Sequence, residues 1–413
     1  MKPGDNTTVP GPAAWVRAIN GGAKLARRAG LRFAGLDADQ IVRQAAARTG
    51  CDDFGPDDGW RTGLEMLTDD YRRHARLTAI GQIAAHRHLV DLLANRLWME
   101  RDRARNPDIG AQPVRAPLFI VGLPRTGTTL LHMLLAQDPE NRVPETWEVM
   151  HPTPVEESET RRVGRAAREL AWMERLAPGF RVMHPLAPRL PQECIAIDSH
   201  TLQGYEFQTT HNVPNYQRWL EAREKHDVYR HHKRFLQHLQ WQRPGSNWVL
   251  KAPAHLFGLA ELLTIYPDAG IVQTHRNPLE VMASLASLGT MLRAAFSESA
   301  DPRVIGREMS ERWGDGLLRA LEQRDDGRLP VDRFIDIDYR AIVSRPIETV
   351  KTIYARFGRE LTPASEQAMR AFLAANPKDK HGAHHYSLEQ FGLDADEQAE
   401  RFHGYRARFC NQK

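Results

Sequence analysis

The sequence is poor in cysteine and contains no long uninterrupted hydrophobic run. Its three cysteines, Cys51, Cys194 and Cys410, are widely spaced and odd in number, so they predict neither a disulfide framework nor a zinc site. No apolar stretch is long enough to cross a bilayer, and the N-terminus lacks the hydrophobic segment of a secretory signal. These absences predict a cytoplasmic protein without a bound metal.

The chain also lacks a strong charge of one sign. Its 56 Lys and Arg residues against 52 Asp and Glu residues give a formal net charge of +4. A nucleic-acid-binding protein would show a concentrated basic stripe, which is absent, so nucleic acid is not an expected partner. Of the 413 residues, 41% are hydrophobic and 26% are charged, which is typical of a globular protein with a large core.

One segment mixes hydrophobic and basic side chains, at residues 15–33. A basic amphipathic helix can lie on a membrane surface. Gly21, Gly22 and Gly30 interrupt the pattern, however. Packing against another helix is therefore the favoured interpretation, and contact with a membrane surface is the alternative.

Residues 1–110 are predicted to form a helical N-terminal extension. Apolar residues recur at helical spacing in 36–49, 60–67 and 77–99. Asp37 is a candidate N-cap for the first of these helices, and Gly50 is a candidate stop.

Residues 111–413 show a different pattern, in which short apolar runs alternate with helical stretches. The runs, predicted to be buried strands, are 117–121, 248–250, 270–274 and 333–337. The helical stretches are 128–137, 256–266, 278–292 and 346–357. This alternation predicts a three-layer α/β fold with a parallel sheet. Residues 152–243 are predicted to be a helical insertion on the substrate side.

Gly122 to Thr129 is predicted to be a phosphate-binding loop, because it follows a strand and opens a helix. Backbone N–H groups at a helix N-terminus attract anions, and glycines let the backbone approach closely. The corresponding loop of ATPases has a lysine where this chain has Thr128, which argues against nucleoside-triphosphate hydrolysis. Arg125 supplies a charge within the loop instead. The alternative is a tight turn without a ligand.

Pro124-Arg-Thr-Gly-Thr-Thr129 resembles the 5′-phosphosulfate loop of sulfotransferases that use 3′-phosphoadenylyl sulfate. Arg276 and Ser284, eight positions apart after a predicted strand, resemble the pair that binds the 3′-phosphate of the donor. The resemblance spans roughly residues 115 to 395 and is strongest to the bacterial branch with a helical N-terminal extension. It implies that the donor is bound by these two residues and by the loop residues Arg125, Thr126, Gly127, Thr128 and Thr129.

Two further matches are weaker. Tyr339 resembles the strand-end tyrosine that meets the adenine, and Lys380-His381-Gly382 resembles the C-terminal loop over the 3′-phosphate. His381 stands where the family has lysine. The resemblance therefore assigns donor binding here mainly to Lys380 and to the backbone near Gly382. We interpret His384 and His385 as flanking the donor's phosphates.

Sulfuryl transfer requires aligned reactants, neutralised charge and a base for the acceptor proton. Arg125 and Lys251 are the electrostatic candidates, which would make a metal unnecessary. Lys251 follows a predicted strand and is expected at the carboxyl edge of the sheet, where ligands bind in such folds. The alternative for Lys251 is an ordinary surface lysine.

Three residues compete as the base. Tyrosylprotein and heparan sulfotransferases place a catalytic glutamate in a segment comparable to 145–149, which favours Glu148, with Glu145 second. His255 is the main rival, because the cytosolic type has its catalytic histidine shortly after a comparable lysine. The choice stays open.

Two other functions remain alternatives. A kinase-like enzyme would need a carboxylate for magnesium, for which Asp336 or Asp338 could serve. A non-catalytic nucleotide-binding protein would bind without turnover. The acceptor is also open: aromatic residues in the insertion suit a small molecule, a lipid or a glycan. The sequence does not decide whether the chain forms a homo-oligomer. His231 and His232 are expected to be exposed on a helix.

Overall fold

The computed structural model describes residues 20–22, 35–153, 155–176, 186–245, 247–376 and 386–410. Within these ranges the strands form a parallel sheet with the order β2-β3-β1-β4-β5. The strands are β1 (Leu118–Gly122), β2 (Asn141–Arg142), β3 (Asn247–Lys251), β4 (Gly270–His275) and β5 (Phe334–Asp338). Four of them match the predicted runs to within one residue at each end. β2 was missed, because two residues are too few to give a hydrophobic pattern.

All strand pairs are parallel, so the carboxyl ends of the strands meet at one edge of the sheet. Ile120 on β1 lies opposite Lys251 on β3, and Gly122 lies opposite Thr274 on β4. β1 and β4 are buried along their whole length, as expected for strands covered on both faces. The predicted three-layer α/β fold is confirmed.

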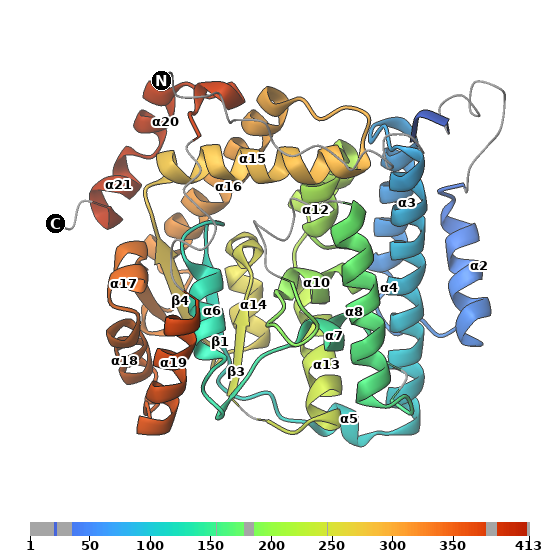
Figure 1. Ribbon diagram of the computed structural model, residues 1–413, viewed down its shortest axis with the longest axis horizontal. Helices are drawn as coiled ribbons and strands as arrows, with labels where there is room; N and C mark the ends of the chain where they lie inside the picture. Colours follow the sequence, from blue (N-terminus) through green and yellow to red (C-terminus); the bar gives the residue numbers. More distant parts are fainter. Residues whose placement is uncertain are drawn as a thin grey trace.

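One face of the sheet is covered by the helices that follow β1 and β5, as Figure 1 shows. They are α6 (Thr128–Leu135), α17 (Tyr339–Ser344), α18 (Pro346–Arg356) and α19 (Pro363–Ala375). Leu118 and Ile120 of β1 point into this layer, where they share a buried core with Leu131 and Val350.

The other face packs against a larger set of helices, and Phe119 and Val121 of β1 point towards it. The set comprises α13 (His226–Gln242), η2 (Pro253–Phe257), α14 (Leu259–Ile265), α15 (Pro278–Phe296) and α16 (Pro302–Asp325). By length and composition alone α15 could cross a membrane, but 56% of its most apolar window is buried inside the protein. We therefore describe α15 as a core helix.

The N-terminal part is helical, as predicted, and builds a separate core with the insertion. Its helices are α2 (Ala38–Thr49), α3 (Gly59–Arg73), α4 (Ala79–Arg105) and α5 (Asp108–Ala111). Asp37 caps α2 by accepting a hydrogen bond of 2.9 Å from the Gln40 N–H, and Gly50 ends the helix in the left-handed conformation. Most of the segment 15–33 lies outside the described residues.

The insertion is mostly helical and runs along the side of the sheet nearest α4 (Figure 1). It holds α8 (Glu159–Leu176), α10 (Cys194–Asp198), η1 (Ser199–Thr201), α11 (Glu206–Thr210) and α12 (Pro214–Ala222), and ends with α13. The expectation of exposed histidines on α13 was wrong. His231 and His232 are 5% and 0% exposed, and a hydrogen bond of 2.8 Å between His232 Nδ1 and the Tyr266 hydroxyl lets that ring be buried.

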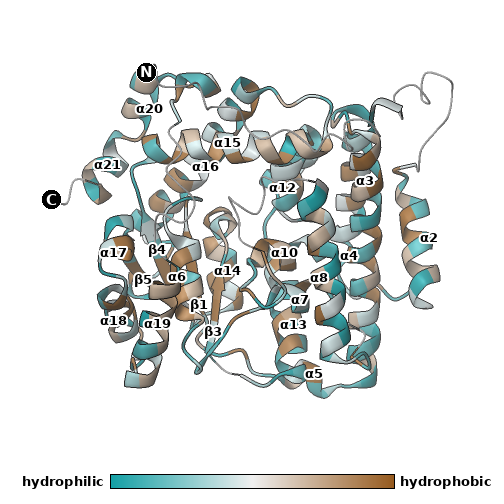
Figure 2. Cartoon of the chain, in the orientation of Figure 1, coloured by the Kyte–Doolittle hydropathy of each residue, from teal (hydrophilic) through white to brown (hydrophobic). Residues whose placement is uncertain are grey.

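The remaining elements are short. They are α7 (Thr146–Met150), η3 (Val331–Arg333), η4 (Glu389–Phe391), α20 (Ala395–Arg401) and α21 (His403–Phe409). Figure 2 shows hydrophobic residues concentrated on the strands and on the inner helices, with hydrophilic residues on the outer helices. The carboxyl edge of the sheet, where polar residues follow the buried strands, is therefore the natural place to look for chemistry.

Candidate active site

The loop between β1 and α6 lies at the carboxyl edge of the sheet. Gly122 has a φ of 138°, and a Cβ there would lie 2.4 Å from Thr274 Oγ1 on β4. Gly127, directly before α6, has a φ of 86°, in the left-handed region that favours glycine. Thr126 fixes the loop between them: its hydroxyl donates to the Leu123 carbonyl at 2.7 Å and lies 2.6 Å from the Thr274 hydroxyl. The loop is thus tightly held by its own residues and by β4.

The start of α6 presents backbone N–H groups to this loop. No side chain among the described residues caps the helix, whose first residues are Thr128 and Thr129. Uncapped N–H groups and the helix dipole together attract an anion. Arg125 is exposed in the loop, with a φ of 69°. The arrangement suits a phosphate or sulfate group.

Lys251 ends β3 beside this loop, and its side chain is only 2% exposed. Its ammonium group donates a hydrogen bond to Thr129 Oγ1 at 3.2 Å and forms an ion pair with Glu193. The strand register places Lys251 next to β1, and its burial and its contact with Thr129 keep the charge inside the protein rather than in solvent. Lys251 therefore contacts both the predicted Thr129 and a carboxylate, Glu193, that no motif in the sequence indicates.

Arg276 follows β4 and reaches the same loop from the other side. Its Nη1 donates to the Arg125 carbonyl at 3.1 Å, and its guanidinium lies 4.3 Å from the centre of the Tyr339 ring. The Tyr339 ring also packs on Gly127, where a Cβ would lie 3.2 Å from it. Glu280 pairs with Arg276 at 3.1 Å and is half exposed. Ser284 lies half-buried on α15, two turns after the helix begins.

Glu148 lies in a different environment. Its carboxylate is 3% exposed and accepts two hydrogen bonds from Arg142, at 2.6 and 2.9 Å. It also accepts from the Glu145 N–H at 2.9 Å and from Arg243 at 3.2 Å. Arg142 pairs in the sheet with Trp248, three residues before Lys251, which is roughly 10 Å along a strand. Among the described residues the structure brings Glu148 neither to Lys251 nor to the loop.

The other two candidate bases are also engaged elsewhere. His255 is 1% exposed in η2, where its Nδ1 lies 3.0 Å from the Tyr229 hydroxyl and its ring packs edge-on against Phe119. Burial and the nearby His232 hold the pKa of His255 well below its usual value, so this ring is neutral and a poor proton acceptor. Glu145 accepts from the Trp147 ring N–H at 2.7 Å and pairs with Arg243.

Comparison with known proteins identifies the family. Residues 117–363, more than half of the chain, match the sulfotransferase family. The chain belongs to that family. It is therefore a sulfotransferase enzyme, and the match spans β1 through α18 with the loop, Lys251 and Arg276 inside it.

Solved structures agree with this assignment. The crystal structure of the sulfotransferase STF1 from Mycobacterium tuberculosis has a TM-score of 0.79 at 31% identity, covering 90% of this chain and 100% of that one. That of STF9 from Mycobacterium avium has a TM-score of 0.80 at 28% identity, covering 91% and 97%. The fold of this sulfotransferase, including the N-terminal helices, is thus shared with both.

Two relatives are named for their activity. They are omega-hydroxy-beta-dihydromenaquinone-9 sulfotransferases, named Stf3, from Mycobacterium bovis and Mycobacterium tuberculosis. Each is 26% identical over 294 residues, which cover 66% of this chain and 71% of the relative.

In this sulfotransferase, the carboxylates that a kinase could use for magnesium hold the fold together instead. Burial alone would raise the pKa of Asp336, but hydrogen bonds from His275 and Arg324 hold it well below its usual value. Asp338 caps α17 by accepting from the Arg340 N–H. The predicted Lys380, His381 and Gly382, with His384 and His385, lie outside the described residues.

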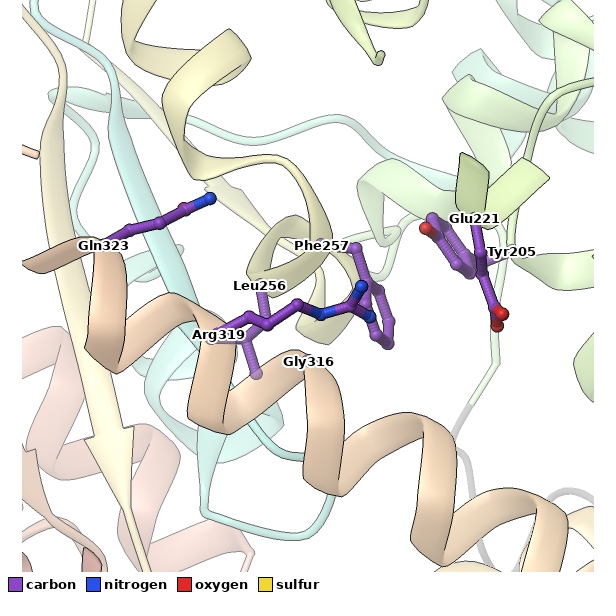
Figure 3. A pocket seen from close by; sticks show the side chains of 7 residues that line it. All are labelled: Tyr205, Glu221, Leu256, Phe257, Gly316, Arg319 and Gln323. Atoms are coloured by element: carbon purple, nitrogen blue, oxygen red, sulfur yellow. The ribbon is translucent and has the colours of Figure 1, made fainter. Parts of the chain in front are cut away.

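A cavity of about 100 Å³ lies beyond η2 on the insertion side of this sulfotransferase. Figure 3 shows its lining, in which Arg319 of α16 extends across Phe257 towards Tyr205 and Glu221. The Tyr205 and Phe257 rings stack at 4.5 Å. A cavity of about 150 Å³ can bind benzene, so this one would take a small group and not a whole lipid.

Proposed function

We propose that this sulfotransferase uses 3′-phosphoadenylyl sulfate as its donor and transfers the sulfuryl group to a hydroxyl on an apolar lipid acceptor. One observation carries the donor assignment. Arg276 is fixed at the loop by the Arg125 carbonyl and the Tyr339 ring, next to an uncapped helix start but at the end of a different strand, β4. Two anion sites side by side suit a nucleotide with phosphate groups at both its 5′ and 3′ positions.

The residues present fit such a donor. Gly122 and Gly127 let the loop pack closely on β4 and α17, because a Cβ at Gly122 would meet Thr274 and one at Gly127 would meet Tyr339. The N–H groups of the first turn of α6, with Arg125, suit the 5′-phosphosulfate. Arg276, with Ser284 on the next helix, suits the 3′-phosphate, and the Tyr339 ring suits the adenine. The donor supplies the sulfuryl group, and these residues orient it.

The charge that develops during transfer is met by side chains rather than by a metal in this proposal. Lys251 is buried and already bonded to Thr129, so its position costs no reorganisation when charge builds up on the leaving oxygen. Arg125 adds a second cation at the loop. The same proposal includes catalysis without a metal. It also includes a cytoplasmic location, which the three free cysteines favour.

The proposed acceptor class rests on the relatives. The Stf3 enzymes are named for a hydroxylated menaquinone, which is a lipid. The insertion in this chain carries the aromatic residues Tyr205, Phe207, Tyr216 and Trp219. Tyr205 lines the cavity beyond η2, whereas Phe207 and Tyr216 are buried in the core shared with the N-terminal helices. A glycan or small phenol is the rival acceptor.

Calorimetry tests the donor assignment. Adenosine 3′,5′-bisphosphate should bind much more tightly than AMP, and Arg276→Ala should remove about 2–4 kcal/mol of that affinity while reducing AMP affinity far less. Arg303→Ala, an exposed arginine on α16, is the matched control and should alter neither value. Equal affinities for the bisphosphate and AMP would remove the proposed 3′-phosphate site.

A transfer assay tests the acceptor class. With donor labelled in the sulfuryl group, we expect label to reach an ω-hydroxylated isoprenoid quinone in detergent micelles and not a monosaccharide or a simple phenol. Label in the sugar or the phenol instead would contradict the lipid proposal.

A further inference from the structure

We infer that Glu193 is the base that takes the proton from the acceptor hydroxyl. The inference rests on the proposed function, and it assigns a residue that the family resemblance did not indicate. Glu193 immediately precedes α10, in the insertion, and its carboxylate is 16% exposed. It forms an ion pair with Lys251, whose ammonium group also binds Thr129 at the start of α6. A single side chain, that of Lys251, thus connects the Glu193 carboxylate to the phosphate-binding loop.

The backbone around Glu193 is held firmly in place. The segment before it is joined to the start of α7 by three backbone hydrogen bonds: Thr146 to Leu190 at 3.0 Å, Trp147 to Pro188 at 2.9 Å, and Gln192 to Pro144 at 2.8 Å. The Glu193 N–H donates to the side chain of Gln192 at 2.9 Å. The carboxylate is therefore positioned by the fold before any substrate binds, as a base must be.

The rival bases are held by other partners. Both oxygens of Glu148 are occupied by Arg142, and Arg243 adds a further contact. His255 is enclosed by Phe119 and Tyr229, and its Nε2 is buried without a partner among the described residues. Of the candidates discussed, Glu193 alone contacts Lys251, so it links the loop to the insertion in which Glu193 lies.

In the proposed transfer, Glu193 acts on the acceptor, and Lys251 and Thr129 act on the donor. The acceptor O–H bond breaks, and its proton goes to a carboxylate oxygen of Glu193. The electron pair left on the acceptor oxygen forms the new S–O bond. The S–O bond to the 5′-phosphate of the donor breaks with its electron pair, and adenosine 3′,5′-bisphosphate leaves. Lys251 and Thr129 stabilise the charge on that leaving oxygen, and Glu193 then passes its proton to water.

The test compares Glu193→Gln with the wild-type protein in single-turnover transfer to the ω-hydroxylated isoprenoid quinone. Glutamine keeps the shape and the hydrogen bond to Lys251 but cannot take up a proton usefully. We expect the rate to fall by about 10²–10⁴-fold and its rise with pH to disappear, while the affinity for adenosine 3′,5′-bisphosphate changes less than about threefold. Glu193→Asp should recover part of the rate. Glu140→Gln, at an exposed glutamate, is the matched control.

Each other outcome has a distinct meaning. Near wild-type transfer by Glu193→Gln overturns this inference and leaves the proposed function standing. Loss of bisphosphate binding together with transfer also overturns it, because Glu193 would then only hold Lys251 in place. A wild-type protein that transfers label to no hydroxyl overturns the proposed function, and the inference with it.

Discussion

At the scale of single residues, two glutamates show why position along the chain is a poor guide to chemistry. Glu148 follows the phosphate-binding loop in the order that the family resemblance favours, but its carboxylate is closed off by Arg142. Glu193 lies 45 residues further on, in a segment without a motif, and contacts Lys251. Each carboxylate forms a different ion pair, and we propose that this difference separates a structural Glu148 from a catalytic Glu193.

Replacing Glu148 by glutamine should reduce stability more than chemistry. The change leaves the Arg142 guanidinium buried with a neutral partner, and breaking such a pair costs roughly 3 kcal/mol. Urea unfolding should show this loss, whereas Glu140→Gln should unfold like the wild-type protein. A Glu148→Gln protein that is fully stable yet transfers over 100-fold more slowly would restore Glu148 as the base.

Sequence alone could place Lys251 but not Glu193. Lys251 ends a short apolar strand, and the carboxyl edge of a parallel sheet is a general ligand site. Glu193 reaches that edge only because residues 188–192 hydrogen-bond to residues 144–147. A contact between two loops more than 40 residues apart leaves no periodic signal in the sequence.

At the scale of elements, the loop and its helix depend on Gly127. An alanine there must keep a φ near 86° and lies 3.2 Å from the Tyr339 ring. The left-handed conformation costs about 1–2 kcal/mol for a residue with a Cβ, and the Tyr339 ring must shift. We expect Gly127→Ala to weaken bisphosphate binding at least tenfold in calorimetry.

Gly164→Ala is the control for this change. Gly164 lies in α8, where the nearest atom to an added Cβ is 3.7 Å away, so helix propensity favours the alanine. Its bisphosphate affinity should equal that of the wild-type protein. Unchanged affinity in Gly127→Ala would show that the loop does not need its left-handed residue for binding.

Sequence predicted four of the five strands, including β5, which is only partly buried. β1 and β4 are buried throughout, so their apolar runs stand out. α16 was missed, although Asp301 and Pro302 mark its start, because Gly306, Gly314 and Gly316 interrupt its helical pattern. Those glycines lie where Phe391, Arg401 and Phe257 pack closely on the helix, which is a tertiary requirement.

At the scale of the whole molecule, buried neutral histidines make folding sensitive to acid. Burial lowers the pKa to about 3 or 4 in five of them: His132, His200, His211, His232 and His238. In the unfolded chain they titrate near 6.5, so the unfolded state takes up protons first as the pH falls. Their contribution to stability is therefore complete above about pH 6.5 and is lost progressively below it, at roughly 1.4 kcal/mol per pH unit for each histidine.

Melting temperatures between pH 8 and pH 4.5 check this prediction. We expect a plateau above pH 7 and a steep fall below pH 6. His403→Gln, at an exposed histidine, should follow the same curve as the wild-type protein. A melting temperature that stays constant down to pH 5 would show that these side chains are not buried in their neutral form.

We propose above all that this chain moves a sulfuryl group from 3′-phosphoadenylyl sulfate using side chains alone. The most direct measurement follows label from the sulfuryl group of the donor, with an ω-hydroxylated isoprenoid quinone as acceptor and a chelator present. We predict labelled quinone and adenosine 3′,5′-bisphosphate in equal amounts, at a rate that added magnesium does not change and that Lys251→Ala reduces by at least 100-fold. Bisphosphate formed without labelled acceptor, or transfer that requires magnesium, would contradict the claim.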